Sequence, residues 1–466
     1  MEFEVIIGLE LHIQMNTKSK MFSSGPVTFG KEPNTQVALF DMAYPGVMPV
    51  VNKQAVVNAI RVSHALHMTI DDTLIFDRKN YFYSDLPKGY QITQEFRPIG
   101  RDGYLDNIGI ERLHIEEDTC KQFHYKDYSL LDYNRAGIPL IEIVSKPEIK
   151  NGQEAAEFVQ KIQSIVTYLG VSDGKMENGS LRCDVNVSLK EKGSNKLGTK
   201  VEIKNLNSVS NIQKAIDFEI RRQKSLLEKG ECIKQETRRF DEHSKETVLM
   251  RVKTDAIDYK CFTEPNIPPI KLSKDFIEDV IKTSPELAEA KLERYQSLGL
   301  SNYDSNLLVA DVNIANYFDE GVKFGVNPKL FANWIITDIQ AVLNKEEIEI
   351  TEFKIRPVHM VELINLIETK QISNKQARVI FAKMLVEPIS PKEILVKSGL
   401  SLINNEKELK EIVDEILNGN EQSIKDYQNG KDKVVGYLVG LVMKKTEGKA
   451  NPELANKIVL EELKRR

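Results

Sequence analysis

Three segments in the N-terminal half of this chain alternate between apolar and polar side chains with a period of two. In residues 5–14 the apolar series leaves Glu10 and His12 on the opposite face, and residues 181–189 and 200–205 repeat the pattern. A period of two is the signature of a β-strand, because successive side chains point to opposite faces of a sheet. One apolar and one polar face indicate antiparallel strands that pack on a core on one side only. The sequence therefore predicts a sheet with one open polar face.

Carboxylates, amides and a histidine dominate that polar face, where a merely hydrated surface would be rich in threonine, serine and lysine. Residues 114–118 (HIEED) add a histidine and three consecutive carboxylates, and Glu142 interrupts the apolar run 139–144. A carboxylate in an apolar strand needs a partner, a raised pKa or a metal ion. Adjacent carboxylates repel unless water or a cation neutralises them. These residues predict an anionic site on the sheet.

Oxygen ligands combined with one histidine favour Mg²⁺ or Mn²⁺ over a soft metal. Catalytic zinc on His and Glu stays open as an alternative, although no HExxH motif supports it. A Walker A motif is missing, and no GxGxxG sits between a predicted strand and helix. Any nucleotide is therefore expected to be held by metal, lysine and arginine side chains.

The pattern of apolar and polar residues changes near residue 265. Short alternating segments precede residues 263–269 (TEPNIPP), and long helical patterns follow them. A chain of 466 residues is long enough for two or three domains, and clustered prolines continue neither a helix nor a central strand. We expect an α+β protein with a sheet domain at 1–270, a helical domain at 271–400 and a helical tail domain at 401–466.

Three pairs of residues predict helix starts in the C-terminal half, because a capping side chain precedes a proline: Ser284-Pro285, Asn327-Pro328 and Ser390-Pro391. In the tail, Gly436 and Gly440 are expected to permit close helix packing. Lysines outnumber acidic residues between positions 428 and 452, and such a patch can bind an RNA backbone or simply face solvent. These lysines are Lys431, Lys433, Lys444, Lys445 and Lys449.

Bulk properties exclude several classes of protein. The net charge of −5 does not indicate a nucleic-acid binder, so RNA contact must come from a local patch. The four cysteines form no CxxC pair, which argues against a disulfide framework. No apolar stretch approaches the roughly 20 residues of a membrane span, and the acidic N-terminus lacks the basic flank of a secretion signal. We expect a cytoplasmic protein without membrane contact.

Eight motifs in the N-terminal half, in this order, resemble those of the B subunit of glutamyl/aspartyl-tRNA amidotransferases. The motifs are residues 7–12 (IGLELH), 44–52 (YPGVMPVVN), 77–83 (DRKNYFY), 112–118 (RLHIEED), 134–143 (NRAGIPLIEI), 179–186 (GSLRCDVN), 202–208 (EIKNLNS) and 235–240 (QETRRF). The tail is similar too, at residues 429–431, 436–440 and 450–452. The resemblance covers essentially the whole chain.

This resemblance implies a cradle-like N-terminal domain and an ATP-dependent ligase that forms carbon–nitrogen bonds with glutamine as amido donor. A misacylated tRNA carries Glu or Asp, whose carboxylate is phosphorylated with ATP and Mg²⁺. Ammonia from a glutaminase A subunit then converts it to the amide, and a small C subunit completes a heterotrimer. Many relatives bind zinc through early cysteine pairs, but residues 21–25 (MFSSG) contain none, so no zinc is expected.

The resemblance also implies roles for residues of the polar face. Glu10, His12, Glu117 and Glu142 are expected to bind metal, and Glu142 is expected to be catalytic. Lys88 and Glu117 resemble residues at the mouth of the ammonia channel, where a carboxylate can take a proton from ammonium. The nucleotide is expected to contact Arg182, Asp184 and Lys204, with Arg238 and Arg239 as further phosphate or tRNA ligands. The rival hypothesis is a module that only binds tRNA while a partner carries the chemistry.

Overall fold

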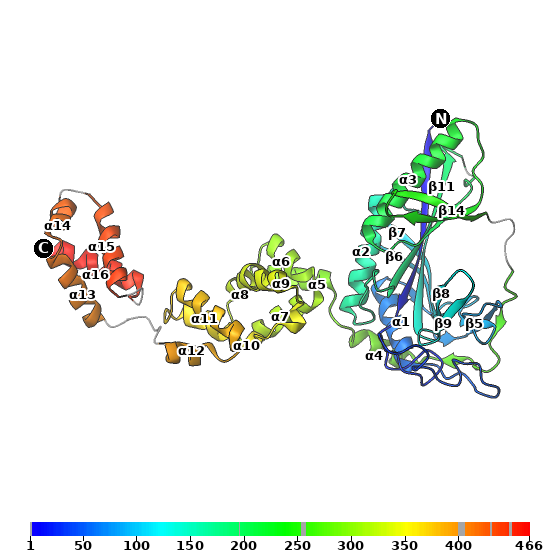
Figure 1. Cartoon of the computed structure of the whole chain (residues 1–466), viewed down its shortest axis with the longest axis horizontal. Helices are drawn as coiled ribbons and strands as arrows, with labels where there is room; N and C mark the ends of the chain where they lie inside the picture. Colours follow the sequence, from blue (N-terminus) through cyan, green and yellow to red (C-terminus); the bar gives the residue numbers. More distant parts are fainter. Residues whose placement is uncertain (1, 195, 253–257, 399–405, 429–430, 447–449) are drawn as a thin grey trace. The chain divides into compact units, whose positions relative to one another are not determined.

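The computed structural model describes residues 2–194, 196–252, 258–398, 406–428, 431–446 and 450–466 (Figure 1). The chain forms two compact units, Met1–Ala288 and Glu289–Arg466. The α+β class is confirmed, because a large sheet forms the first unit and helices follow it. The first unit extends past residue 270 because α4 (Lys274–Lys282) packs against α1 (Lys53–Ala65). The expected boundary at 400/401 lies outside the described residues.

A nine-stranded sheet organises the first unit. Its pairings are antiparallel except for the parallel pair of β12 and β13. The strands in spatial order are β14 (Glu246–Val252), β13 (Glu236–Asp241), β12 (Val201–Lys204), β11 (Leu181–Glu191), β1 (Phe3–Gln14), β10 (Pro139–Ser145), β7 (Ile108–Glu117), β6 (Gly100–Leu105) and β2 (Thr69–Ile70).

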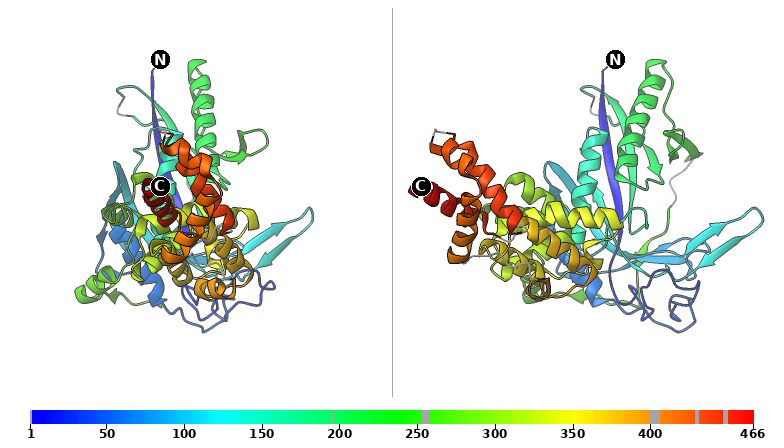
Figure 2. Two further views of the ribbon diagram at one scale, coloured as in Figure 1. Left: turned by 90° about the vertical axis from the view of Figure 1, so that its left-hand side faces the viewer. Right: turned by 60° about the vertical axis from the view of Figure 1, so that its left-hand side comes forward.

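The central strand β1 confirms the predicted alternation. Ile7, Leu9 and Leu11 are completely buried, whereas Glu10 and His12 on the other face are half-buried. Three helices cover the apolar face and share one core with it: α1, α2 (Gly152–Tyr168) and α3 (Val209–Glu228). Figures 1 and 2 show α2 and α3 side by side along this face. The helices leave the polar face of the sheet open.

Smaller strands border the polar face. β4 (Asp77–Asn80), β5 (Tyr90–Thr93) and β15 (Phe262–Thr263) form one sheet. The other small sheets are β3 (Thr73–Leu74) with β16 (Ile270–Lys271), and the hairpin β8 (Lys121–His124) with β9 (Ser129–Asp132). Arg78 on β4 forms an ion pair with the buried Glu264, with Nη2 2.9 Å from Oε1. This pair fixes the segment that follows residue 258.

The described elements of the second unit are helices, arranged around two separate hydrophobic clusters. The first cluster is formed by α5 (Ala288–Ser297), α6 (Asn302–Val309), α7 (Val312–Lys323), α8 (Pro328–Trp334), η1 (Ile335–Ile339), α9 (Gln340–Glu346), η2 (Ile350–Glu352), α10 (Pro357–Glu368), α11 (Asn374–Val386) and α12 (Pro391–Ser398). The second lies among α13 (Glu406–Asn418), α14 (Glu421–Gln428), α15 (Lys433–Lys445) and α16 (Pro452–Arg465).

Two of the three predicted helix starts are confirmed. Asn327 caps α8, and Ser390 accepts a hydrogen bond from the first turn of α12. The start at Ser284-Pro285 was wrong, because α5 begins at Ala288. Ser284 instead ends α4: its hydroxyl donates to the Val280 carbonyl. Among the described residues, no helix combines the length and apolar character that crossing a membrane requires.

The ion pair between Arg78 and Glu264 provides a test of the fold. Replacing Glu264 by Gln leaves the guanidinium without its charge partner, and this should lower the free energy of unfolding by about 2–3 kcal/mol, because breaking a mostly buried pair is costly. Urea denaturation of both chains measures the difference. The control is Asp258→Asn, which breaks the exposed pair with Lys260 and should leave stability nearly unchanged. Equal stability of Glu264→Gln and the parent chain would contradict this role.

Candidate active site

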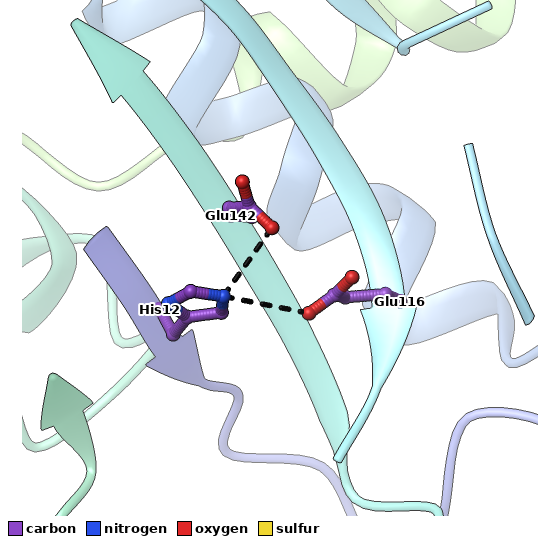
Figure 3. Close-up of side chains that lie close together, drawn as sticks. All are labelled: His12, Glu116 and Glu142. Carbon is purple, nitrogen blue, oxygen red and sulfur yellow. Dashed lines mark ion pairs between the residues drawn. The ribbon is translucent and has the colours of Figure 1, made fainter. Parts of the chain in front are cut away.

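Two histidines and two glutamates from three neighbouring strands converge on the polar face. Figure 3 shows three of them, His12, Glu116 and Glu142. Antiparallel pairing places His12 of β1 opposite Glu142 of β10, and Glu142 opposite His114 of β7. Both imidazole Nε2 atoms lie 3.3 Å from Glu142 Oε2. Glu116, two residues after His114, lies 3.8 Å from His12 Nε2 and 3.4 Å from His114 Nε2. We call these four residues the histidine–glutamate cluster.

Charges within this cluster stabilise one another. Burial lowers the pKa of His114, but the carboxylates of Glu142 and Glu116 outweigh burial and raise this pKa to about 10. The pKa of His12 is raised in the same way, against its own burial. Burial raises the pKa of Glu142, and the two imidazoles more than reverse that effect and hold it well below its usual range. The neighbouring carboxylates therefore favour the protonated form of both imidazoles.

A second acidic group lies beside the first, on strands β1, β11 and β12. Glu10, Asp184 and Glu202 bring carboxylate oxygens within 4.8 Å of one another. The ammonium group of Lys204 forms an ion pair with Asp184 and lies 3.3 Å from Glu202. Burial lowers the pKa of Lys204, but the carboxylates of Asp184 and Glu202 outweigh burial and raise this pKa above its usual value. This lysine therefore stays charged. We call these three carboxylates the acidic trio.

Both groups line one polar cavity of about 860 Å³. Residues 258–261, which lead into the Arg78–Glu264 pair, and Arg112 of β7 line it as well. The histidine–glutamate cluster offers two carboxylates and imidazole nitrogens, whose atoms on His12, Glu116 and Glu142 also lie within 4.8 Å of one another. The set of His12, Glu116 and Glu142 combines two carboxylates with one imidazole, and the acidic trio offers carboxylates alone. Such donor sets fit a hard divalent cation. The residues present therefore fit Mg²⁺ or Mn²⁺ at this cavity.

Glu117 lies apart from the histidine–glutamate cluster. As the neighbour of Glu116 on β7, its side chain points to the opposite face of the strand. There it accepts hydrogen bonds from the Ile92 amide at 3.0 Å and from Lys88 Nζ at 3.0 Å. Burial raises the pKa of Glu117, and Lys88 only partly opposes that shift. The Lys88 ammonium also lies 5.0 Å from the centre of the Phe40 ring.

A third charged group lies next to His12 and consists of Arg182 of β11, Asp118 and Arg135. Its guanidinium donates to the buried Asp118 at 2.9 Å, and Arg135 lies 3.7 Å from the same carboxylate. Burial raises the pKa of Asp118, but the two arginines lower it below its usual value. A cavity of about 570 Å³ connects Arg182 and Arg135 with His12 and Lys204. Arg238 is engaged elsewhere, because it donates to Glu236 at 2.8 Å and to Thr247.

The structure thus brings together most of the residues singled out from sequence. The main cavity is lined by Glu10, His12, Glu142, Asp184 and Lys204. Arg182 lines the neighbouring cavity of about 570 Å³. Glu117 was expected among the metal ligands, but its side chain lies on the face of β7 opposite the main cavity. Its neighbour Glu116 lies beside His12 in that cavity instead. His114 and Glu116 had been expected only as members of the anionic run 114–118 and Glu202 only as part of a polar strand face, without an individual role at the site. The alternation of Leu113 and Ile115 with His114 and Glu116 was the available signal for the first two.

Comparisons with known proteins agree with this architecture. A family model described as the GatB/GatE catalytic domain matches residues 5–278, and one described as the GatB domain matches residues 316–463. Curated relatives, named as the B subunit of aspartyl/glutamyl-tRNA(Asn/Gln) amidotransferase, align over 100% of both chains. The relative from Persephonella marina is 47% identical, that from Bacillus cytotoxicus 46% and that from Oceanobacillus iheyensis 47%. With a polar-faced sheet, a helical second unit and full-length similarity, this chain belongs to the family of aspartyl/glutamyl-tRNA(Asn/Gln) amidotransferase B subunits.

Proposed function

We propose that the main cavity phosphorylates the side-chain carboxylate of Glu or Asp on a misacylated tRNA with ATP, and that ammonia then displaces the phosphate to give Gln-tRNA(Gln) or Asn-tRNA(Asn). One observation carries this proposal. The histidine–glutamate cluster and the acidic trio, each with carboxylates placed to hold a cation, line the same polar cavity. Bringing a carboxylate against a triphosphate joins two anions, which requires positive charge in the site. No phosphate-binding loop motif occurs in the sequence to supply it.

The histidine–glutamate cluster and the acidic trio would hold Mg²⁺ in this proposal. Bound there, Mg²⁺ would neutralise phosphate charge and align the donor and acceptor oxygens. The surrounding chain keeps the ligands in place, since each glutamate or histidine projects from a paired strand. His12 and His114 hold Glu142 ionised in the free protein, so that its oxygens stay ready to accept a cation. Lys204 and Arg182 supply permanent positive charge for phosphate oxygens.

Glu117 and Lys88 would handle ammonia in the second half of the reaction. The carboxylate of Glu117 is buried and lies on the face of β7 opposite His114 and Glu116. A carboxylate so placed can accept a proton from ammonium without competing for the metal ion, and Lys88 orients it through their 3.0 Å contact. Ammonia must arrive unprotonated to attack the activated carboxyl group, so a proton acceptor on its route is needed.

Ammonia requires a source, and the proposal assigns it to partner subunits. A glutaminase A subunit would release it from glutamine, and a small C subunit would complete a heterotrimer in the cytoplasm. The whole assembly would then be an ATP-dependent carbon–nitrogen ligase with glutamine as amido donor. The name shared by the relatives, which describes one component of an amidotransferase, supports this division of labour.

The tail helices would bind the body of the tRNA. On α15, Lys433, Tyr437, Gly440 and Lys444 follow one another at helical spacing and are exposed. A Cβ built at Gly436 or Gly440 meets no described atom within 4 Å, so the expected close helix packing at these glycines was wrong. An exposed stripe with cations and an aromatic ring suits an RNA backbone. Lys449 lies outside the described residues.

Glu142→Gln should abolish the proposed activation. The substitution keeps the shape of the side chain but removes the charge that both histidines and a cation require. Since loss of an outer-shell partner already costs about 10–100-fold, tRNA amidation should fall by about 100-fold or more. Amidation and tRNA-dependent ATP hydrolysis are measured in the assembled complex, and glutaminase activity should persist. The control Glu157→Gln changes an exposed residue of α2. Normal ATP turnover by Glu142→Gln would favour a module that only binds tRNA.

Glu117→Gln should separate the two halves of the reaction. The amide keeps the hydrogen bond from Ile92 but accepts a proton poorly, so amidation should fall by about 10²-fold, the usual contribution of a general base. ATP hydrolysis in the presence of the misacylated tRNA should stay within a few-fold of normal, because the substitution leaves the histidine–glutamate cluster and the acidic trio unchanged. Product analysis by thin-layer chromatography measures both. Parallel loss of both activities would place Glu117 among the metal ligands instead.

Lys433→Ala combined with Lys444→Ala should weaken tRNA binding. Each lost phosphate contact should lower the slope of log affinity against log salt by about 0.7–0.9. The matched control removes Lys431 and Lys445, whose ammonium groups are already paired with Asp426 and Glu415. Filter binding across a salt series compares the two double variants. An unchanged slope in the first variant would exclude α15 from the tRNA interface.

A further inference from the structure

Lys20 and Asp41 form an ion pair that is shielded from water. Their side chains are 0% and 2% exposed, and Lys20 Nζ lies 3.0 Å from Asp41 Oδ2. The same ammonium group donates to the Tyr133 carbonyl at 3.2 Å. Burial lowers the pKa of Lys20, and the carboxylate of Asp41 only partly opposes that shift. Because a buried pair contributes little net stability, we expect it to act on the geometry of the segments that it joins. We call these two residues the buried clamp.

Two hydrogen-bond donors and two glycines pack tightly around the carboxylate of the clamp. Asp41 accepts hydrogen bonds from the Ser23 hydroxyl and from the Ala38 amide, both at 2.7 Å. A Cβ at Gly25 would lie only 2.7 Å from Asp41 Oδ2, and one at Gly137 would lie 3.0 Å from Oδ1. Gly137 also has a φ of +84°, a conformation that favours glycine. The clamp therefore joins its own loop to the turn that precedes β10.

Phe40 connects the buried clamp to the contact between Lys88 and Glu117. Phe40 directly precedes Asp41 and is buried, and the centre of its ring lies 5.0 Å from Lys88 Nζ. The face of an aromatic ring attracts a cation within about 6 Å, and more strongly where water is excluded. The two ion pairs also influence each other, since Glu117 raises the pKa of Lys20 and Lys88 lowers it. Four charged groups thus lie in one buried region around this ring.

The turn at Gly137 connects the clamp to the end of β7. The Gly137 amide donates to the Asp118 carbonyl at 2.9 Å, and the Asp118 amide donates to the Ile138 carbonyl at 2.8 Å. Asp118 directly follows Glu117 in the chain. Both members of the neighbouring ion pair are therefore fixed through the clamp, the carboxylate by this turn and the ammonium group by the aromatic ring.

We propose that the buried clamp is a positioning element: it holds the ring of Phe40 over the ammonium group of Lys88, which in turn orients Glu117. This inference rests on the proposed function, in which Glu117 takes a proton from ammonium. When ammonia arrives too slowly, water attacks the phosphorylated carboxyl carbon, its oxygen replaces the phosphate and its protons pass to solvent. That side reaction returns the carboxylate and uses ATP without forming amide. The clamp and the ring should therefore set the yield of amide per ATP hydrolysed.

Phe40→Leu tests this inference, because leucine is apolar but offers no ring face to the ammonium group. In the assembled complex, with glutamine and misacylated tRNA, the yield of amide per ATP should fall by about 5-fold, as expected for the loss of a cation–π contact. The rate of ATP hydrolysis should stay nearly unchanged. Thin-layer chromatography of the amide and phosphate release are measured in one reaction, and their ratio does not depend on the fraction of folded protein.

Phe158→Leu is the matched control for a loss of packing. Phe158 is a buried ring of α2 in the same hydrophobic core as Phe40, so both substitutions should lower the unfolding temperature. Only Phe40→Leu should lower the yield. A normal yield in Phe40→Leu, or an equal loss in both variants, would overturn the inference.

Asp41→Asn tests whether the clamp acts through the ring. Asparagine can still accept the hydrogen bond from the Ala38 amide but leaves Lys20 without its charge partner, so the unfolding temperature and the yield should both fall. The double variant with Phe40→Leu should show the same yield as Phe40→Leu alone, because the two residues act in series. A normal yield in Asp41→Asn, or two losses that multiply in the double variant, would overturn the inference.

The same assay separates this inference from the proposed function. Absence of ATP-dependent amide formation in the parent complex would contradict the proposed function itself. A parent complex that loses yield with Glu117→Gln but not with Phe40→Leu would retain the proposed function and overturn only the positioning role of the clamp.

Discussion

The register of β1 between β10 and β11 is the constraint on which the site depends. It places His12 opposite Glu142 on one side, and Glu10 opposite Asp184 on the other. A shift of one residue would turn these side chains into the core and expose leucine and isoleucine instead. The apolar face, buried beneath α2 and α3, therefore stabilises the position of the polar side chains on the other face. Hydrophobic packing on one side of the sheet sets the geometry of the chemistry on the other.

Electrostatic balance explains how such a dense set of charges survives partial burial. An isolated buried carboxylate is costly, and removing one partner of a buried pair costs more than forming the pair gains. In the histidine–glutamate cluster two imidazoles offset two carboxylates, and in the acidic trio Lys204 offsets part of the charge. The acidic trio keeps a surplus of negative charge, which would favour a divalent cation in the proposed site.

Much of the sheet could be predicted from the sequence, because period-two alternation reports directly which face of a strand is buried. The same alternation places Glu116 on the face of His114 and Glu117 on the opposite face, although the resemblance led us to expect Glu117 among the metal ligands. The sequence could not show that β7 pairs with β10, and this pairing brings Glu116 within 3.8 Å of His12 Nε2. Ser284-Pro285 failed for a related reason, since a capping serine can end one helix as readily as it begins the next. The contribution of Glu202 required the neighbouring strands, which lie far apart in sequence.

The side-by-side placement of Glu116 and Glu117 has a further consequence. Strand β7 carries two consecutive carboxylates that face opposite sides of it: Glu116 lines the main cavity, and the buried Glu117 contacts Lys88. An insertion or deletion of one residue upstream of them within this strand would turn each carboxylate to the face that the other now occupies. Neither carboxylate can therefore be repositioned along β7 without displacing the other.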